Sequence, residues 1–66
     1  MINIGRCIRL AQADKEVSSK ELAERLDTHR QTINRYRTSD DLKLSVIDKV
    51  AKALDLTLIE LLNYDA

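Results

Sequence analysis

The stretch SSKELAERLDTHRQTINRYR, residues 18–37, decides the fold because it carries the start and stop signals of two consecutive helices. Ser18 is a favourable N-cap, and Glu21, three residues later, is placed to complete a capping box. Asp27 stands where this helix must end, and aspartate tolerates a left-handed turn better than most residues with a side chain. Another helix follows at once, so the spacing predicts a helix-turn-helix. Any small helical bundle has corners of this kind, and the side chains therefore have to decide the function.

The second helix of the pair is expected to begin at Thr28 or His29 and to end near Thr38. Ile33 and Tyr36 give it one thin apolar stripe, which predicts that it lies on a core and exposes its other side. That exposed side is cationic and polar, and its candidate base-contacting residues are Arg30, Gln31, Asn34 and Arg35. Arginine pairs well with guanine, and glutamine or asparagine with adenine, so this face suits the major groove of double-stranded DNA.

The flanking segments are also predicted to be helical, because the chain has no proline and one glycine, Gly5. Periodic apolar residues predict helices over about residues 4–14 and 44–54. A second capping box opens a short helix over residues 57–63. We therefore expect an all-α fold, a compact five-helix bundle that forms a single domain over residues 1–66.

The net charge of zero hides an asymmetry between the two parts of the chain. Residues 1–37 carry eight basic and five acidic side chains, a net +3, whereas residues 38–66 carry three and six, a net −3. Such asymmetry is more informative than the total. The acidic part is interpreted either as a surface for a protein partner or as a solvated face that repels DNA and leaves one docking orientation.

Several classes of protein are excluded by composition. One cysteine, Cys7, allows no internal disulfide, and one histidine allows no tetrahedral zinc site made by the protein alone. The sequence has no nucleophilic side chain matched with a general base and no glycine-rich phosphate loop, so no enzyme activity is expected. Neither a metal nor a cofactor is expected. The sequence shows no signal peptide and no apolar run near the ~20 residues of a membrane span, which predicts a cytoplasmic protein. Cys7 is interpreted as a small hydrophobic residue at the edge of the core.

The strings IGRCIRLAQADKEVSSKELAERLDTHRQTINRYR and VIDKVAKALDLTLIELL together resemble the DNA-binding domains of phage lambda-type repressors and Cro proteins, the xenobiotic-response-element class of helix-turn-helix regulators. The resemblance implies five helices, with the third in the major groove and two subunits on a palindrome. It places Arg30, Gln31, Asn34 and Arg35 on base-contacting positions. Ser19 falls where the family usually has a glutamine that touches a phosphate, and His29 falls on the third-helix N-cap.

The chain also departs from the family pattern. Ser19 is shorter than glutamine and is expected to lose a bracing bond to the third helix. Glu16 and Asp27 replace common turn glycines, and Thr28 is a better cap than His29. The loop over residues 38–43 lacks the usual glycine and proline, so its shape is not predicted.

Two further sets of residues complete the expected site. The candidate phosphate contacts are Ser19, Lys20, Thr28, His29, Thr32, Arg37 and Lys43. The candidate dimer interface is the apolar C-terminal segment, with Leu58, Leu61, Leu62 and Tyr64. That segment has more apolar groups than a short helix with one buried face needs, so we expect a homodimer at least on DNA.

Two functions remain open. The first is a dimeric, sequence-specific transcriptional regulator of the Cro or repressor kind, from a phage or mobile element. The alternative is an antitoxin or another protein-interaction helix-turn-helix module. The third helix discriminates between them, because Arg30, Gln31 and Arg35 together are explained by DNA and not by a generic protein contact.

Overall fold

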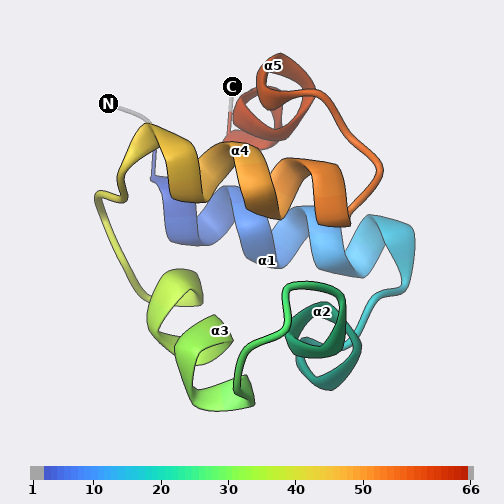
Figure 1. The fold of residues 1–66 in the computed structure, drawn as a ribbon. Helices are drawn as coiled ribbons and strands as arrows, with labels where there is room; N and C mark the ends of the chain where they lie inside the picture. Colours follow the sequence, from blue (N-terminus) through green and yellow to red (C-terminus); the bar gives the residue numbers. More distant parts are fainter. Residues whose placement is uncertain (1–2, 66) are drawn as a thin grey trace.

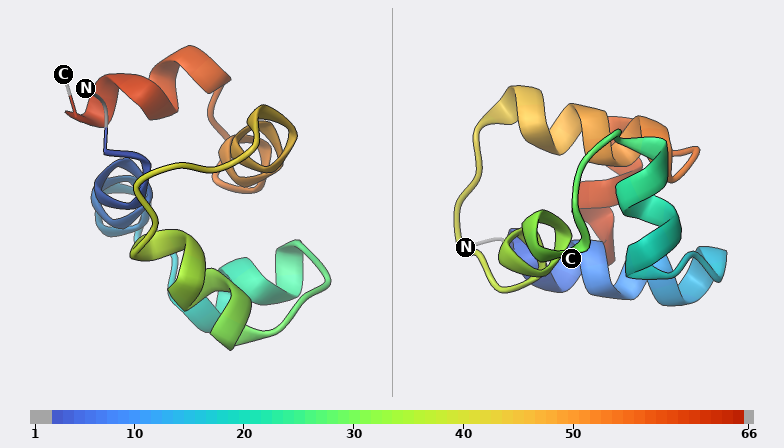
Figure 2. Two further views of the ribbon diagram at one scale, coloured as in Figure 1. Left: turned by 90° about the vertical axis from the view of Figure 1, so that its left-hand side faces the viewer. Right: turned by 60° about the horizontal axis from the view of Figure 1, so that its bottom comes forward.

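The computed structural model describes residues 3–65, and over that range it contains helices and turns but no strand. Its elements in chain order are α1 (Ile4–Lys15), α2 (Ser19–Arg25), α3 (Arg30–Arg37), α4 (Leu44–Ala53), α5 (Leu58–Leu62) and a 3₁₀ turn, η1 (Asn63–Asp65). The five-helix, all-α prediction is confirmed. Helices α1 and α4 run through the middle of the molecule, α5 lies at one end, and α2 with α3 forms the other end (Figures 1 and 2).

Side-chain caps define where three of the helices begin. The Asn3 side chain accepts a hydrogen bond from the Arg6 N–H at 3.0 Å and starts α1. Thr57 accepts from the Glu60 N–H at 3.1 Å, while the Glu60 carboxylate accepts from the Thr57 N–H at 2.9 Å. This reciprocal pair is the capping box predicted at the start of α5. Hydrogen bonding of the carboxyl group to Thr57, first to its backbone and then to its side chain, lowers the pKa of Glu60 from its ordinary value.

The capping box predicted at the start of α2 forms only in part. Ser18 accepts from the Glu21 N–H at 3.1 Å, as expected. The Glu21 carboxylate instead pairs with Arg25 one turn later, at 2.9 Å. The other end of the Arg25 guanidinium donates to the Ala53 carbonyl at 2.7 Å. Arg25 therefore supplies a donor to a free carbonyl at the C-terminal end of α4 and links α2 to α4.

Three helices end in a left-handed residue, and in each case that residue is an acid. Glu16, Asp27 and Asp55 have φ angles of 56°, 54° and 61°. The left-handed turn predicted at Asp27 is confirmed, and Glu16 adopts the same conformation after α1. Glycine is the usual residue at such positions because a Cβ costs energy there. A negative charge at a helix C-terminus is also unfavourable, so these turns carry a small strain.

The core is built around α1. Its largest fully buried side chains are Ile8, Leu22, Ile33, Leu54, Leu61, Val50 and Cys7. Cys7 was expected at the edge but is fully buried, and its thiol donates to the Leu62 carbonyl at 3.7 Å. Burial, as the largest cause, raises the pKa of the thiol, so Cys7 is a core residue.

Gly5 lies where α1 meets the end of α3. A Cβ on Gly5 would lie 2.4 Å from the Arg37 carbonyl oxygen and 2.9 Å from that of Ser39. The Gly5 N–H donates to the Ser39 carbonyl at 3.0 Å. Only glycine permits this approach of two backbones, and it fixes the end of α3 on α1. The sequence alone does not predict this contact of Gly5.

The C-terminal turn is fastened to α1. Asp65 accepts from the Asn3 N–H at 2.7 Å and pairs with Arg6 at 3.3 Å. The Tyr64 hydroxyl donates to the Asp14 carboxylate at 2.6 Å, and this bond is the main reason that the pKa of Tyr64 is raised. Segments from both ends of the sequence thus lie side by side (Figure 1).

Candidate nucleic-acid interface

The outward face of α3 has the composition expected of a DNA-reading helix. Ile33 is fully buried and Tyr36 is half-buried, which orients the helix as its apolar stripe predicts. Arg30, Gln31, Asn34 and Arg35 are all exposed. Within residues 3–65, none of these four side chains makes a hydrogen bond or an ion pair. The helix therefore presents four donor-rich side chains that the domain itself does not use.

The turn between α2 and α3 sets the start of this face. The Thr28 N–H donates to the Ala23 carbonyl at 2.9 Å and closes the left-handed turn at Asp27. His29 is the N-cap of α3, but its side chain makes no capping bond. Thr28 does not cap α3 with its side chain either. No side chain of residues 3–65 therefore accepts a hydrogen bond from the backbone N–H groups of the first turn of α3, which begins with the exposed Arg30.

The candidate phosphate contacts differ in exposure. Lys20, His29 and Lys43 are exposed, whereas Ser19, Thr28, Thr32 and Arg37 are half-buried. Lys43 is the N-cap residue of α4, at the end of the loop that follows α3. These residues therefore come from α2, the turn before α3, α3 itself and the start of α4.

Arg37 braces the helix pair, which the sequence analysis did not predict. Its Nη1 donates to the Ser19 hydroxyl at 2.8 Å, so Ser19 does keep a bond to α3. Gln12 on α1 approaches the same hydroxyl at 3.5 Å and donates to the Val17 carbonyl at 3.3 Å. The expectation that Ser19 would lose its bond to α3 is therefore wrong. The long Arg37 side chain spans the distance that the glutamine usual in the family would span from α2. The contacts of Gln12 could not be predicted from the sequence, because no local pattern indicates them.

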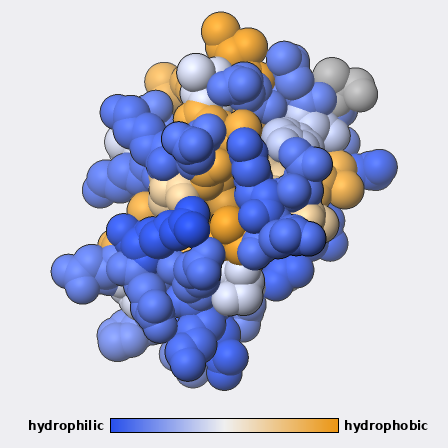
Figure 3. All heavy atoms as spheres, turned by 90° about the vertical axis from the view of Figure 1, so that its right-hand side faces the viewer, coloured by the Kyte–Doolittle hydropathy of each residue, from blue (hydrophilic) through white to orange (hydrophobic). Residues whose placement is uncertain are grey.

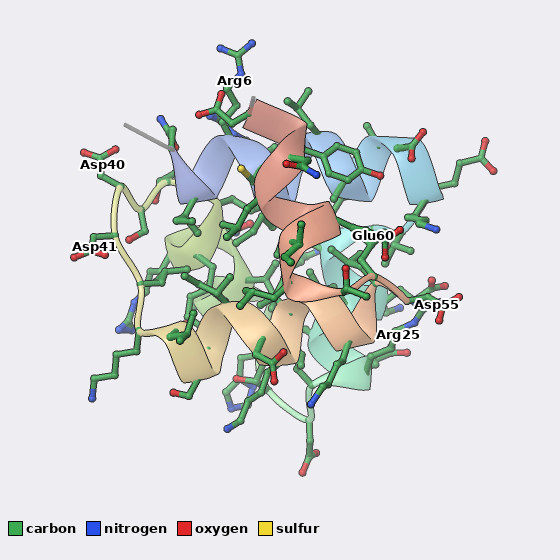
Figure 4. The ribbon with its side chains drawn as sticks, turned by 90° about the horizontal axis from the view of Figure 1, so that it is seen from above. Arg6, Arg25, Asp40, Asp41, Asp55 and Glu60 are labelled. Carbon is green, nitrogen blue, oxygen red and sulfur yellow. The ribbon has the colours of Figure 1, made fainter. Side chains whose placement is uncertain are left out.

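The loop over residues 38–43 places two acids away from the helices. Asp40 and Asp41 point outward from the segment between α3 and α4 (Figure 4). Ser39 holds the loop, because its hydroxyl donates to the Asp41 carbonyl at 2.7 Å and accepts from the Asp41 N–H at 3.4 Å. The loop shape thus depends on Ser39 and on its bond to Gly5.

The sequence from residue 8 to residue 66 matches the family described as Cro/C1-type HTH DNA-binding domain. The chain belongs to this family. Comparison with curated proteins gave no significant match. The family is one of DNA-binding regulators, which agrees with the geometry of α3 and with the expected absence of enzyme chemistry.

In this Cro/C1-type domain the most exposed large hydrophobic residues lie outside the helix pair. Figure 3 shows hydrophobic atoms gathered over the upper half of the molecule, and a hydrophilic lower half where α2 and α3 lie. The most exposed large hydrophobic residues are Ile59, at 71%, and Leu44, at 65%. Leu58, Leu62 and Tyr64 are half-buried. Leu61 is fully buried in the core, so its side chain is not available to a second subunit, and the expected interface is corrected at that position.

The part of this Cro/C1-type domain that the structure describes offers no cluster of three or more histidine, cysteine or acidic side chains that could hold a metal ion. Over the same residues, no helix is long and apolar enough to cross a membrane.

Proposed function

We propose that this domain is a sequence-specific transcriptional regulator that inserts α3 into the major groove. The observation that carries the proposal is the set of exposed side chains of Arg30, Gln31, Asn34 and Arg35, which make no hydrogen bond or ion pair within residues 3–65. Base-edge contacts by such side chains specify sequence, whereas contacts to phosphates position the protein. Arg30 and Arg35 suit guanine, Gln31 suits adenine, and Asn34 is a weaker reader.

The regulator is proposed to act as a dimer on a palindromic operator and to repress by occupying it. Family membership supports the DNA-binding part. Support for the dimer comes from the α5 end, where Leu58, Leu62 and Tyr64 are only half-buried and Ile59 is exposed. Ile59 takes the place that the sequence analysis gave to Leu61. Two copies of this segment together would remove their apolar surface from water.

A second candidate is a protein-interaction module such as an antitoxin. It is favoured by the acidic residues of the second half, among them Asp40, Asp41, Asp55 and Glu60, which are exposed. Figure 4 shows Asp40 and Asp41 together at one edge of the molecule, and Asp55 and Glu60 toward the opposite side. They do not form one patch, so this candidate is the weaker of the two.

Selection of bound sites from random-sequence DNA, followed by titration, tests the proposal. Arg35→Ala is expected to weaken binding to the selected site by about 1–3 kcal/mol and to relax preference at one base pair in each half-site. Lys20→Ala and Lys43→Ala are expected to weaken all sequences together and to reduce the salt dependence by roughly 0.9 for each lost contact. Lys15→Ala is the matched control, because Lys15 lies on the side of α1 where its charge reaches Glu60 of α5.

The outcomes separate the readings of α3. If Arg35→Ala lost the same affinity for the cognate site and for the altered DNA, Arg35 would be a phosphate contact. The base-contacting face of α3 would then be a different one from the face proposed. If the wild-type protein selected no DNA at all, the outward face of α3 would contact a protein instead.

A further inference from the structure

A hollow of about 370 Å³, open to solvent, lies beside the helix-turn-helix. It is bounded by α1, by the turn between α1 and α2, and by the end of α3. Its polar lining consists of Arg9, Gln12, Glu16, Ser18, Ser19 and Arg37. Two of these residues, Ser19 and Arg37, were assigned to phosphate contacts from the sequence. Arg9 was not assigned to DNA, and α1 had been given only a structural role.

Two residues that line the hollow each have a buried polar atom without a partner among the described residues. Gln12 is only 6% exposed, and its Oε1 has no partner among the described residues. The Arg37 Nε is also buried without a partner there, although Nη1 of the same guanidinium bonds to Ser19. A buried polar atom without a partner costs free energy. Only the Arg37 Nε is a donor, so an oxygen acceptor is what the Arg37 guanidinium lacks, whereas the Gln12 Oε1 lacks a donor.

The charge of the hollow favours an anion. No carboxylate pairs with Arg37 or Arg9 in residues 3–65. The Arg9 Nε donates to the Gly5 carbonyl one turn earlier, at 3.3 Å, which holds the stem of the side chain along α1. Glu16 is the one acid in the lining, and it is exposed. Two guanidinium groups against one solvated carboxylate leave a net positive hollow. Guanidinium groups also match the geometry of phosphate oxygens.

We infer that this hollow binds a phosphodiester of the DNA backbone, with Arg9 of α1 as a phosphate contact opposite Arg37. The inference rests on the proposed function, because it requires α3 to lie on DNA. The hollow is open to solvent, which suits a phosphate carried on a long strand. It adjoins Ser19, the first residue of α2. Arg9 thereby extends the protein–DNA contact from the helix pair to α1.

Titration of Arg9→Gln against the selected site and against unrelated DNA tests this contact. Near ~0.1 M salt, loss of one phosphate contact is expected to weaken binding about eightfold and to reduce the salt slope by roughly 0.9, equally on both DNAs. Lys15→Gln removes the same charge from the same helix on its α5 side and is expected to change neither quantity. Glu16→Gln removes the acid of the lining and is expected to tighten binding. Melting curves confirm that the variants are folded.

DNA with single uncharged methylphosphonate linkages locates the phosphate. Wild-type protein is expected to bind less tightly when one particular linkage in each half-site is uncharged. The same substitution is expected to leave the affinity of Arg9→Gln unchanged, because removing either partner removes the same interaction. If wild-type protein binds its site but Arg9→Gln matches Lys15→Gln at every salt concentration and every linkage, the inference is wrong and the proposed function stands. If wild-type protein binds no DNA, the proposed function itself has failed.

Discussion

The two ends of the molecule use their polar side chains in different ways. At the α5 end, Asp65, Tyr64 and Glu60 all bond within the chain, to α1 or to their own cap. At the other end, the four outward side chains of α3 have no partner within residues 3–65. The first arrangement holds the fold together. The second leaves hydrogen-bond donors in water, which favours a partner that supplies acceptors. The functional end is therefore the one whose polar groups contribute least to the fold.

Among the changes considered, Gly5→Ala is expected to lower the stability of the fold most, because Gly5 holds the end of α3 against α1. The new Cβ would meet the backbone of Arg37 and Ser39 at less than 3.0 Å, and backbone cannot move aside as a side chain does. We expect a loss of about 3 kcal/mol, at the upper end for overpacking. That is a large part of the stability of a domain this small. Thermal unfolding by circular dichroism measures it, with Lys15→Ala on the same helix as control. An unchanged melting temperature would mean that α3 does not approach α1 so closely.

Ile59→Glu tests whether the α5 end serves a second subunit. Ile59 is 71% exposed, so the change is expected to leave the stability of the monomer unaltered. Binding to a full palindrome is expected to weaken at least ~10-fold, toward the affinity for a half-site, since the apolar contact between subunits is lost. Leu44→Glu, at the exposed start of α4, is the matched comparison. If Leu44→Glu removed cooperativity and Ile59→Glu did not, the interface would lie at the start of α4.

The local parts of this fold could be predicted from sequence, and the long-range parts could not. Capping at Ser18 and Thr57 and the left-handed turn at Asp27 depend on neighbouring residues alone, and the structure has all three. The burial of Leu61 was missed because two adjacent leucines, Leu61 and Leu62, fit a short apolar helix equally well until its packing partner is known. Periodicity also placed the exposed face of α3 correctly.

The hollow beside α2 could not be predicted because its residues are separated in sequence. Arg9, Ser19 and Arg37 come together only when α1 crosses the helix pair. Gly5 did leave a signal, since a lone glycine inside an otherwise regular helix usually marks a close contact. No local pattern, however, says which backbone it contacts.

Asp55→Gly is expected to stabilise the α5 end of the molecule and to leave DNA binding unchanged. Asp55 has a φ of 61° and follows the C-terminus of α4, so glycine relieves both the backbone strain and the unfavourable charge. We expect a gain of about 0.5–1 kcal/mol, part of which the greater freedom of the unfolded chain cancels. A melting curve measures the gain, and Asp55→Asn separates the charge from the conformation. A loss of stability would show that the Asp55 side chain has a favourable contact.

Glu60→Gln gives the smallest expected effect, and its sign depends on pH. The bonds from Thr57, backbone first, lower the folded-state pKa of Glu60, so the carboxylate stabilises the fold above its unfolded pKa. That contribution is lost as the pH falls through the folded value. Wild-type protein is therefore expected to be slightly more stable than Glu60→Gln at neutral pH and equal to it in acid. Unfolding curves at several pH values measure the difference, and a constant difference would rule out the ionised cap.

The bond between the Asn3 N–H and the Asp65 carboxylate also has a use in protein engineering. Residues 62 positions apart are joined on the side of the molecule away from α2 and α3 (Figures 1 and 2). Two copies fused in tandem through a flexible glycine-serine tether from these ends would keep both recognition helices unobstructed. For the dimer proposed above, the tether would replace association between separate subunits by a high effective concentration of the second copy. Such a covalent pair would bind an operator at protein concentrations at which separate subunits do not associate.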